Sequence, residues 1–586
     1  MPMRHGVKAM KIESIEDLEK LNRESCRRLY YPDGIKVNIG LAMCGIAAGA
    51  KASLERAREA FPPGKGVEIA QSGCLGFCRE EPLVEILESG KPRIVYKRIT
   101  EDKILDLIEG YREGELHREW ALGQMRDPRS LLEEDLVNPL DSVTPLEGVP
   151  FLEDLPFFSK QKKIALRNAG YIDPERIEEY VARGGYFAFL RALYKMKPAE
   201  IIQAVKESGL RGRGGGGFPT GVKWETCAKK GPERYVICNA DEGNPGTYMD
   251  RSILEGDPHS VLEGMLIAGF AIGSSQGFIY VRHEYPLAVR RLITAIRQAE
   301  EYGLIGEDIG GSGFDFRIKI STGAGAFVCG ESTALMASLE GKVGRPRAKY
   351  VHTVEKGFRM SPSNLNNVET YANVPVILIN GAEWYSGIGT QYSKGTKVFS
   401  LVGKIENTGS IEVPMGMPLR DVVFEIGGGI PGGKAFKAVQ TGGPSGGCTP
   451  EIFLDLPVDF QELTRVGSMM GAGGMIVMDE DNCMVDMARH FLEFLKEESC
   501  GQCNPCREGI KRMLEILTRI CEGDGKEGDV EILEELGSMM QKFSLCGLGT
   551  SAPNPVLSTI LYFRDEYEAH ILEKRCPAGV CKGLPR

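Results

Sequence analysis

The chain has 586 residues, a formal net charge of −10 at pH 7 and 42% hydrophobic residues. This length predicts several domains, each with a core of its own, and the acidic balance does not indicate a nucleic-acid partner. No apolar run reaches the length of a membrane span, and the first residues lack the apolar stretch of a secretion signal. Sixteen cysteines, several at ligand-like spacings, favour metal sites in a reducing compartment over disulfides. We therefore expect a cytoplasmic multidomain protein.

The first third of the chain is predicted as a helical arm, a small mixed domain and a linker. Residues 1–34 carry apolar side chains near helical spacing. Residues 35–115 have an order of elements that resembles a thioredoxin-like ferredoxin domain. Residues 116–158 are rich in Glu and Pro and lack periodicity, which predicts an extended linker. In the mixed domain, strands are expected at 35–40, 67–70, 83–87 and 93–96, and helices at 50–60 and 104–111.

Three cysteines of the mixed domain are candidate metal ligands. Cys44, Cys74 and Cys78 have the spacing of part of a thioredoxin-fold [2Fe–2S] site. The related pattern has a fourth cysteine five residues before Cys44, where this chain has Ile39, and a hydrocarbon side chain cannot ligate iron. Either another residue substitutes, with Cys26 the nearest cysteine in sequence, or the domain holds no cluster and serves for docking. Both interpretations stay open, and the glycines kept around the cysteine pair favour the cluster.

A glycine-rich loop opens the middle third of the chain, with the sequence GLRGRGGGGFP at 209–219. A glycine run lets backbone amides approach a phosphate without Cβ clashes, and Arg211, Arg213 and Lys223 add positive charge. Taken alone, such a run is also typical of a flexible loop. Its spacing matches neither the P-loop nor a clean dinucleotide fingerprint.

Three polar turns follow this loop. Residues 235–243 predict a strand that ends at Asn239, Asp241 and Glu242, and strand ends are where α/β folds place their ligands. The glycine and amide turns at 323–331 and 366–370 each open an apolar helical stretch. Such turns are good positions for hydrogen bonds to a flavin and its phosphate.

The C-terminal part is predicted as two further domains. Residues 393–478 combine short strands, one helix and many glycines, which is typical of a small β-grasp domain, and residues 479–560 are helical. In the helical part, Cys500, Cys503 and Cys506 are separated by two residues each, and Cys546 follows at a distance. This spacing predicts a [4Fe–4S] cluster. Structural zinc sites usually come as two cysteine pairs.

Residues 561–586 form a tail with three more candidate ligands, His570, Cys576 and Cys581. A tetrahedral zinc site needs a fourth ligand, and Cys483, in a polar turn at a predicted helix start, is the best candidate. Two alternatives remain: the tail cysteines bind a second iron–sulfur cluster, or His570 simply ends a helix. We expect zinc, which clamps the tail to the cluster bundle.

The glycine-rich loop, Asn-Ala-Asp-Glu at 239–242, Gly-Glu-Ser-Thr-Ala at 330–334, Asn-Asn-Val-Glu-Thr at 366–370 and the cysteine triple together resemble one family. It comprises the FMN- and NADH-binding flavoprotein subunits of respiratory complex I, NAD-reducing hydrogenases and electron-bifurcating hydrogenases. The resemblance covers about residues 36–586. It implies a multidomain chain of α/β and α+β classes with an FMN- and NAD(H)-binding α/β domain at 159–392. The N-terminal extension and the tail are most similar to the bifurcating-hydrogenase β subunit, and we expect this chain to lack that subunit's C-terminal two-cluster ferredoxin domain.

The resemblance also implies which residues bind the flavin and the nucleotide. Lys223 and glycine amides suit the phosphate of FMN, and Asn and acidic side chains suit the ribityl hydroxyls and the ring edges. The resemblance also implies that Phe218 and Lys349 contact NAD(H). Without it, Phe218 would be interpreted as a core-packing residue and Lys349 as a charge on the surface. The residues implied for FMN are Gly212, Arg213, Gly214, Lys223, Asn239, Asp241, Glu242, Gly330, Glu331, Asn366 and Asn367.

Three positions depart from related sequences near the nucleotide. Asn244 stands where an acidic residue is usual, Thr226 replaces an aromatic residue of some relatives, and His352 replaces a Phe. Loss of an acid near the substrate alters which nucleotide charge the site accepts. These changes bear on the choice between NADH and NADPH, whereas FMN binding is expected to persist.

The implied function is that of a flavin subunit. Hydride moves between NAD(H) and FMN, and single electrons leave through the [4Fe–4S] cluster, so no side-chain nucleophile or acid–base pair is required. An electron-bifurcating hydrogenase-type complex is the expected setting. The alternatives are the diaphorase subunit of an NAD-dependent formate dehydrogenase or a non-bifurcating hydrogenase, and a non-catalytic electron-wiring scaffold with a decayed nucleotide site. Expected partners are a small [2Fe–2S] thioredoxin-like subunit, a larger iron–sulfur subunit and a hydrogenase module, with ferredoxin acting indirectly.

Overall fold

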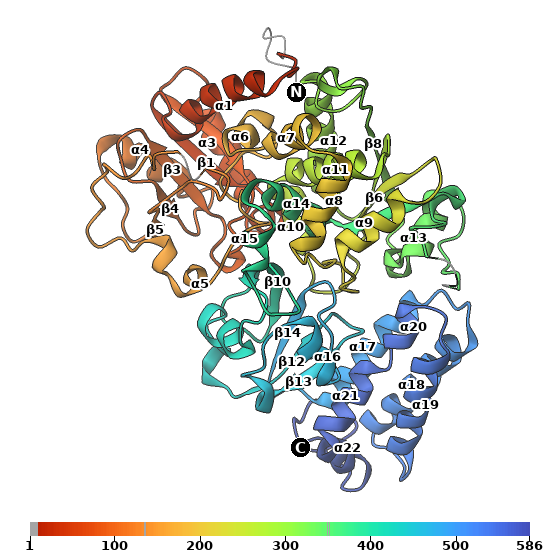
Figure 1. The fold of residues 1–586 in the computed structure, drawn as a ribbon. Helices are drawn as coiled ribbons and strands as arrows, with labels where there is room; N and C mark the ends of the chain where they lie inside the picture. Colours follow the sequence, from red (N-terminus) through yellow and green to blue (C-terminus); the bar gives the residue numbers. More distant parts are fainter. Residues whose placement is uncertain (1–9, 134–135, 349, 351) are drawn as a thin grey trace.

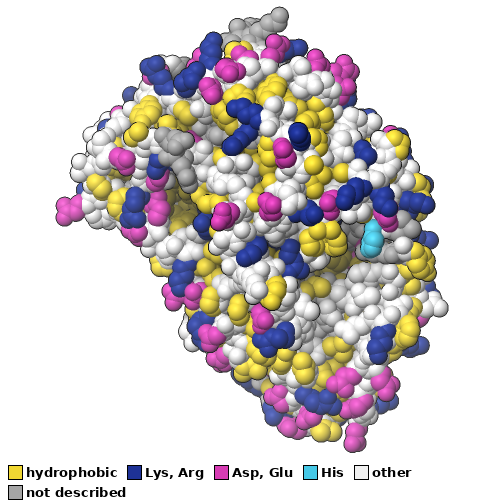
Figure 2. Space-filling model, in the orientation of Figure 1, with side chains coloured by type: hydrophobic (Ala, Val, Ile, Leu, Met, Phe, Trp, Pro, Cys, Tyr) yellow, Lys and Arg dark blue, Asp and Glu magenta, His cyan; other side chains and the backbone are white. Residues whose placement is uncertain are grey.

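The computed structural model describes residues 10–133, 136–348, 350 and 352–586 (Figure 1). These residues form three β-sheets with flanking helices, followed by a C-terminal set of helices. The fold is therefore of mixed α/β and α+β class, as predicted. Within the described ranges, no helix is long and apolar enough to cross a membrane. On the face drawn in Figure 2, Lys and Arg side chains alternate with Asp and Glu and do not gather into a basic stripe.

The N-terminal sheet carries the mixed domain. Its strand order is β2-β1-β3-β4-β5, with β1 and β2 parallel and the other pairs antiparallel. Its apolar side chains pack against the helices α3 and α4 in one core. The elements are α1 (Ile15–Tyr30), β1 (Ile35–Gly40), α2 (Met43–Ala47), α3 (Ala50–Ala60), β2 (Val67–Ser72), β3 (Val84–Glu88), β4 (Ile94–Tyr96), α4 (Ile104–Glu113) and β5 (Ala121–Gln124).

The segment predicted as a linker begins with a strand. β5 pairs antiparallel with β4 and completes the N-terminal sheet, so residues 121–124 belong to the mixed domain. Four residues are too few for a periodic pattern to appear in the sequence. Further along, the same segment contains the short helices η2 (Leu152–Asp154) and α5 (Pro156–Ser159).

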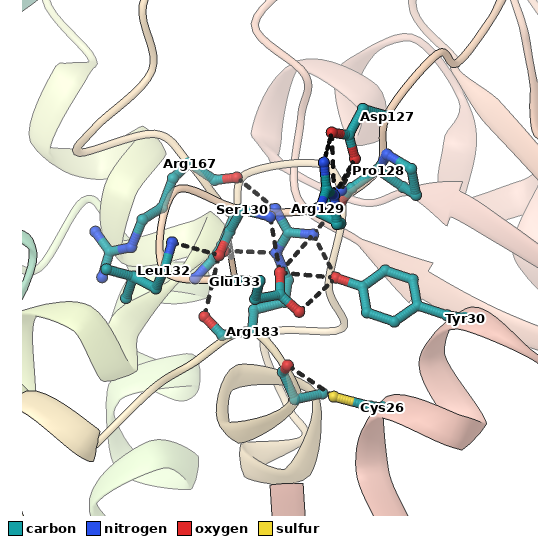
Figure 3. A network of polar contacts seen from close by, with 12 residues as sticks. Cys26, Tyr30, Asp127, Pro128, Arg129, Ser130, Leu132, Glu133, Arg167 and Arg183 are labelled. Carbon is teal, nitrogen blue, oxygen red and sulfur yellow. Dashed lines mark hydrogen bonds and ion pairs between the residues drawn. The ribbon is translucent and has the colours of Figure 1, made fainter. Parts of the chain in front are cut away.

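A buried arginine joins the arm, the linker and the middle domain (Figure 3). The Arg183 guanidinium donates to Tyr30 Oη at 3.1 Å, to Asn168 Oδ1 at 2.7 Å and to the Arg167 carbonyl at 3.1 Å. Tyr30 in turn donates to the Glu133 carboxylate at 2.8 Å. Because the guanidinium has several charge-assisted partners, its burial is compensated. The arm is thus fixed to the body of the protein.

The middle domain is built on four parallel strands in the order β8-β7-β6-β9. Alternate β6 residues face different cores: Val236 and Cys238 pack with α11 and α14, whereas Tyr235 and Ile237 pack toward α13 and the C-terminal helices. Both faces of the sheet are covered, as is usual for parallel sheets. All four strands therefore end at one edge. The strands are β6 (Tyr235–Ala240), β7 (Gln276–Arg282), β8 (Arg317–Gly323) and β9 (Ser363–Asn367).

The helices of the middle domain surround this sheet (Figure 1). Two of them, α11 and α14, are almost wholly buried and pack against one another. Short helix η4 (Phe327–Gly330) leads into α13 at the strand-end edge. The helices are α6 (Ile177–Ala182), α7 (Phe187–Lys195), α8 (Pro198–Glu207), α9 (Thr220–Ala228), α10 (Met249–Gly256), α11 (Pro258–Ile272), α12 (Pro286–Glu301), α13 (Ser332–Leu339), α14 (Val368–Asn380) and α15 (Ala382–Ser386).

The third sheet has the strand order β11-β10-β14-β12-β13. Its first strand, β10, and its last strand, β14, are parallel neighbours at the centre, and the other pairs are antiparallel. This is the arrangement of a β-grasp sheet. The elements are β10 (Thr396–Gly403), β11 (Gly409–Pro414), β12 (Phe436–Thr441), β13 (Gly447–Pro450), α16 (Phe460–Arg465) and β14 (Gly474–Asp479).

The C-terminal helices pack beside the β-grasp sheet and below α13 (Figure 1). The sequence predicts one last helix from 555 to 573, but the structure has two, with a break at Phe563. This residue packs in the cluster of Met484 and Phe491, and tertiary packing of this kind overrides local helical preference. The helices are α17 (Met484–Glu498), α18 (Asn504–Cys521), α19 (Asp529–Phe543), α20 (Gly547–Ser551), α21 (Asn554–Tyr562) and α22 (Arg564–Ile571).

Candidate flavin, nucleotide and metal sites

Four of the predicted flavin motifs meet at the strand-end edge of the middle sheet. Asn239, at the end of β6, donates from Nδ2 to the Gly330 carbonyl at 3.0 Å. Asn367, at the end of β9, lies so close to the glycine-rich loop that a Cβ on Gly214 would be 3.0 Å from its own Cβ. The structure therefore brings together the loop, the two strand ends and the start of α13, as expected for parallel strands.

The glycine-rich loop is an ordered hairpin. The Gly212 amide donates to the Phe218 carbonyl at 2.9 Å, and the Thr220 amide donates to the Leu210 carbonyl at 2.9 Å. At the tip, Gly215 forms a bridge with Gly471 just before β14 of the β-grasp sheet, and its φ of +123° requires a residue without Cβ. The structure thus gives this run a defined conformation, with its tip against the segment before β14.

Several buried polar atoms at this edge have no hydrogen-bond partner among the described residues. They are both carboxylate oxygens of Asp241, Oδ1 of Asn366, Oδ1 of Asn244 and Nη1 of Arg282. Buried polar atoms almost always have hydrogen-bond partners in folded proteins, so this set indicates a polar ligand. The hydroxyls of a ribityl chain and the heteroatoms of an isoalloxazine ring supply such partners, and the residues present fit FMN.

Burial raises the pKa of Asp241 to about 7, and the guanidinium of Arg282, with Nη1 at 3.6 Å from Oδ1, opposes the shift. Because the folded protein holds this proton more tightly than the unfolded chain, stability falls as pH rises from about 4 to about 7. For FMN-free protein we expect Asp241→Asn to raise the free energy of unfolding more at pH 8 than at pH 5, with a difference between the two pH values of at most about 3 kcal/mol. Urea unfolding at the two pH values measures this. An equal effect at both would contradict the assignment.

Three predicted flavin ligands have side chains that hold the site together. The Arg213 guanidinium is buried and donates to the carbonyls of Thr396 and Lys394 at 3.0 and 2.6 Å. The Glu242 carboxylate accepts from backbone amides at the start of α10, including the Met249 amide at 2.7 Å. Glu331 caps α13 in the same way. The sequence alone does not show whether a charged side chain bonds to the protein's own backbone or to a ligand. Direct contacts of these three residues with the flavin stay a prediction.

Lys223 lies on α9 and points to the end of β9. Its Nζ donates to the Leu365 carbonyl at 2.8 Å, and burial lowers the pKa of its ammonium group to about 8. One carbonyl satisfies only one of three N–H donors. An ammonium group in this position suits an anionic phosphate, which would also restore its full charge.

We expect Lys223→Ala to weaken FMN binding by about 10- to 100-fold, because it deletes a charge-assisted contact of about 1.5–3 kcal/mol. Fluorescence titration of the FMN-free protein with FMN measures the dissociation constant. Lys229→Ala is the matched control, since Lys229 ends the same helix and pairs with Glu225 at its surface. Equal affinities of the two variants would refute the phosphate role.

The residues predicted for the nucleotide are only partly described. Phe218 is 53% exposed at the hairpin, which disagrees with a core-packing role, and Lys349 lies outside the described residues. Among the departures, Asn244 lies against the β-grasp domain, where a Cβ on Gly443 would be 2.7 Å from its Cγ. Thr226 is on α9 and donates to the Val222 carbonyl at 2.9 Å. The nucleotide contacts stay a prediction.

The four C-terminal cysteines surround one cavity. Cys500, Cys503, Cys506 and Cys546 line it together with Val328 of η4 and other residues. Cys503 precedes α18 directly and Cys546 precedes α20. Amides of two residues after Cys546 donate to its sulfur. Helix-start amides stabilise negative charge on cluster sulfurs, so the site fits the predicted [4Fe–4S] cluster.

The tail cysteines and histidine meet Cys483 in a compact group. The ligand atoms of Cys483, His570, Cys576 and Cys581 all lie within 4.8 Å of one another, and all four residues are buried. Tetrahedral zinc with Zn–S of about 2.3 Å requires S–S and S–N spacings of about 3.5–3.8 Å. The structure has 3.7 Å between the sulfurs of Cys483 and Cys581, and 3.5 and 3.4 Å from these sulfurs to His570 Nε2.

The second nitrogen of this histidine is also held. Nδ1 of His570 lies 2.7 Å from the Glu566 carbonyl, so it carries the proton and Nε2 is left to face the sulfurs. Metal-bound histidines are oriented by such a bond. This arrangement disagrees with the alternative that His570 simply ends a helix.

The three N-terminal cysteines also lie together, with the ligand atoms of Cys44, Cys74 and Cys78 within 4.8 Å of one another. Cys26 is not part of this group. It lies on α1, where its Sγ donates to the Ala182 carbonyl at 3.1 Å (Figure 3). Ile39 is wholly buried in β1. Cys26 therefore does not substitute for the missing cysteine in this structure.

Comparisons with known proteins agree with this geometry. The family model described as the Nuo51 FMN-binding domain matches residues 205–376, and the NADH-ubiquinone oxidoreductase-F iron-sulfur binding region matches residues 486–570. The NADP-reducing hydrogenase subunit HndC of Solidesulfovibrio fructosivorans is 57% identical over 426 residues, which is 72% of this chain and 86% of the relative. The chain belongs to the family of complex I-type flavoprotein subunits. An NADH-quinone oxidoreductase subunit of Rhizobium meliloti (strain 1021) is 45% identical, over 71% of this chain and 99% of the relative.

A solved structure extends the similarity to nearly the whole chain. A crystal structure of NAD+-reducing [NiFe]-hydrogenase in the H2-reduced state superimposes with a TM-score of 0.61 and 29% identity, covering 95% of this chain and 90% of that chain. As a family member, this chain is a flavin- and NADH-binding oxidoreductase subunit that carries FMN and a [4Fe–4S] cluster. FMN supplies the exchange between two-electron hydride chemistry and one-electron transfer. Residues at the strand ends would bind and orient the flavin, and the four cysteines of the C-terminal helices would hold the cluster.

Proposed function

We propose that this chain is the flavin subunit of an electron-bifurcating hydrogenase-type complex. One observation supports electron transfer between the flavin edge and the cysteine cavity: helix η4 borders both. Its Gly330 carbonyl accepts from Asn239 at the flavin edge, and its Val328 lines the cysteine cavity. Hydride exchange with NAD(H) and single-electron exit through the cluster therefore occur on the two sides of one short segment. The similarity to a subunit named as part of an NADP-reducing hydrogenase supports the hydrogenase setting.

The proposal includes partners and a second metal. The chain would work with a small [2Fe–2S] thioredoxin-like subunit, a larger iron–sulfur subunit and a hydrogenase module, with ferredoxin reached through them. Zinc at Cys483, His570, Cys576 and Cys581 would clamp the tail to the helical domain. Such a clamp would fix the surface on which a partner docks. The cytoplasmic location stays a prediction.

A second candidate function is the diaphorase subunit of a non-bifurcating NAD-reducing hydrogenase. The superposition on the NAD+-reducing [NiFe]-hydrogenase over 95% of this chain favours it. The two candidates share all of the chemistry on this chain and differ in whether the partners divide the electron pair between two acceptors.

The experiment has two steps. First, the anaerobically purified, FMN-loaded chain is mixed with NADH and with NADPH, and viologen reduction is followed; failure of both nucleotides to reduce the flavin would favour the electron-wiring scaffold. Second, the complex is purified from its native source through a tag on this chain. Hydrogen formation that requires NADH and reduced ferredoxin together supports bifurcation, whereas hydrogen formation from NADH alone supports the diaphorase.

A further inference from the structure

A buried carboxylate lies beside the three N-terminal thiols, although no metal pattern of the sequence includes it. Oε1 of Glu81 is 3.7 Å from the Sγ of Cys44. Glu81 is 6% exposed. The three cysteines alone are one ligand short of the four that a tetrahedral ion or an iron–sulfur cluster requires. The carboxylate thus adds a fourth potential ligand atom at the site where the cysteine pattern lacks one.

The position of this carboxylate is fixed by the backbone around it. The Leu83 amide donates to Oε2 at 2.8 Å, which leaves Oε1 turned toward Cys44. A Cβ on Gly40 would be 3.2 Å from Oε2, and a Cβ on Gly45 would be 3.1 Å from the same atom. Two glycines therefore leave room for the carboxylate, one of them directly after Ile39, the position of the missing cysteine.

The charges around the Glu81 carboxylate and the three thiols favour a bound cation. Among the described residues, no Lys or Arg nitrogen lies within 4.0 Å of the Glu81 carboxylate, in contrast to its neighbour Glu80, which pairs with Arg98 at 3.0 Å. A buried carboxylate next to thiols is costly unless a positive charge compensates it. The Gly76 amide donates to Cys74 Sγ at 3.2 Å, a bond of the kind that supports metal-bound sulfur.

We propose that Glu81 is the fourth ligand of a metal centre with Cys44, Cys74 and Cys78. Three thiolates and one carboxylate would hold a two-iron cluster, whose four ligand atoms are more widely spread than those of a single tetrahedral ion. This fits the structure, because the three sulfurs lie within 4.8 Å of one another and the carboxylate lies outside that compact group, next to Cys44. The centre lies in the N-terminal domain and is separate from the flavin, the [4Fe–4S] cluster and the tail site, so the proposal goes beyond the function proposed above.

The test uses the full chain, purified without oxygen, with four variants. Iron, acid-labile sulfide and zinc are counted per chain, the reduced protein is examined by EPR, and metal loss to a chelator is timed. Cys44→Ser defines the signal of the N-terminal centre by difference. We expect Glu81→Gln to speed the loss of that metal at least about tenfold, as removal of a metal-site partner does, or to shift the EPR signal. Glu81→Cys should retain the metal with an altered signal.

Glu80→Gln is the matched control, because it removes the same charge from the adjacent buried side chain, which is 8% exposed. FMN content reports correct folding in every variant. Identical metal content, retention and spectra of Glu81→Gln and wild type would overturn the proposal. So would equal losses in Glu80→Gln and Glu81→Gln, or a wild-type protein in which Cys44→Ser removes no metal.

Discussion

Replacing Cys503 by serine will stop electron exit from the flavin while leaving flavin reduction intact. Cys503 lines the cysteine cavity and directly precedes α18, so the substitution removes one of four thiolates. We expect iron to fall by about four atoms per chain. NADH should still bleach the flavin absorbance in an anaerobic stopped-flow experiment, because the strand-end edge is untouched. Transfer to acceptors that are reached through the cluster should fall to background.

Gln502→Ala is the control for this substitution, because Gln502 lines the same cavity without offering a thiolate. It should keep the iron and the electron transfer. Unchanged iron in Cys503→Ser would contradict the cluster assignment. A simultaneous loss of FMN would instead indicate that the helical domain had become unfolded, and Gln502→Ala would show whether the cavity is sensitive to any change.

Removal of the two tail cysteines will release zinc and unfold the tail. In the Cys576→Ala, Cys581→Ala double variant we expect the loss of about one zinc per chain. Structural zinc contributes about 10–16 kcal/mol in small zinc domains, which is more than the packing of one short helix such as α22 supplies. Limited proteolysis should then cut within residues 561–586 in the variant and spare the wild type.

His570→Ala and His490→Ala test the same site with a single change. His570 is wholly buried among the sulfurs, whereas His490 is exposed on α17. Only the first should lose zinc. If the wild type contains no zinc and the double variant loses iron, the tail cysteines bind an iron–sulfur cluster, and the zinc proposal is wrong.

The elements with strong periodic or spacing signals were predictable from the sequence. The helix at 50–60 and the strand at 35–40 coincide with α3 and β1. The cysteine triple and Cys546 do surround one cavity. Cys483 was predictable as the fourth tail ligand because it lies in a polar turn before a helix, and the structure places it in that group. The signal at each of these positions is local, although the fold then joins ligands that are far apart in the sequence.

The features that were missed depend on contacts between distant segments. Strand β5 exists because β4 pairs with it, and the four-residue segment itself gives no period. The sequence also does not reveal that the Arg213 guanidinium donates to carbonyls near β10, more than 180 residues away in the chain; its predicted flavin contact stays a prediction. Glu81 had one weak signal, an acidic residue three positions after Cys78. Only the fold brings its carboxylate to Cys44.

Helix η4 also determines how the rate of electron transfer can be regulated. Its Phe327 amide is bound to Glu498 at the end of α17 at 2.7 Å, and its Gly330 carbonyl is bound to Asn239. Both ends of this four-residue segment are thus tied, one to the cluster domain and the other to the flavin edge. Tunnelling between two redox centres depends steeply on their separation, and a segment tied by hydrogen bonds at both ends would keep that separation constant. Electron flow between the two sites would then respond to changes in their reduction potentials, which nucleotide binding at the flavin can cause.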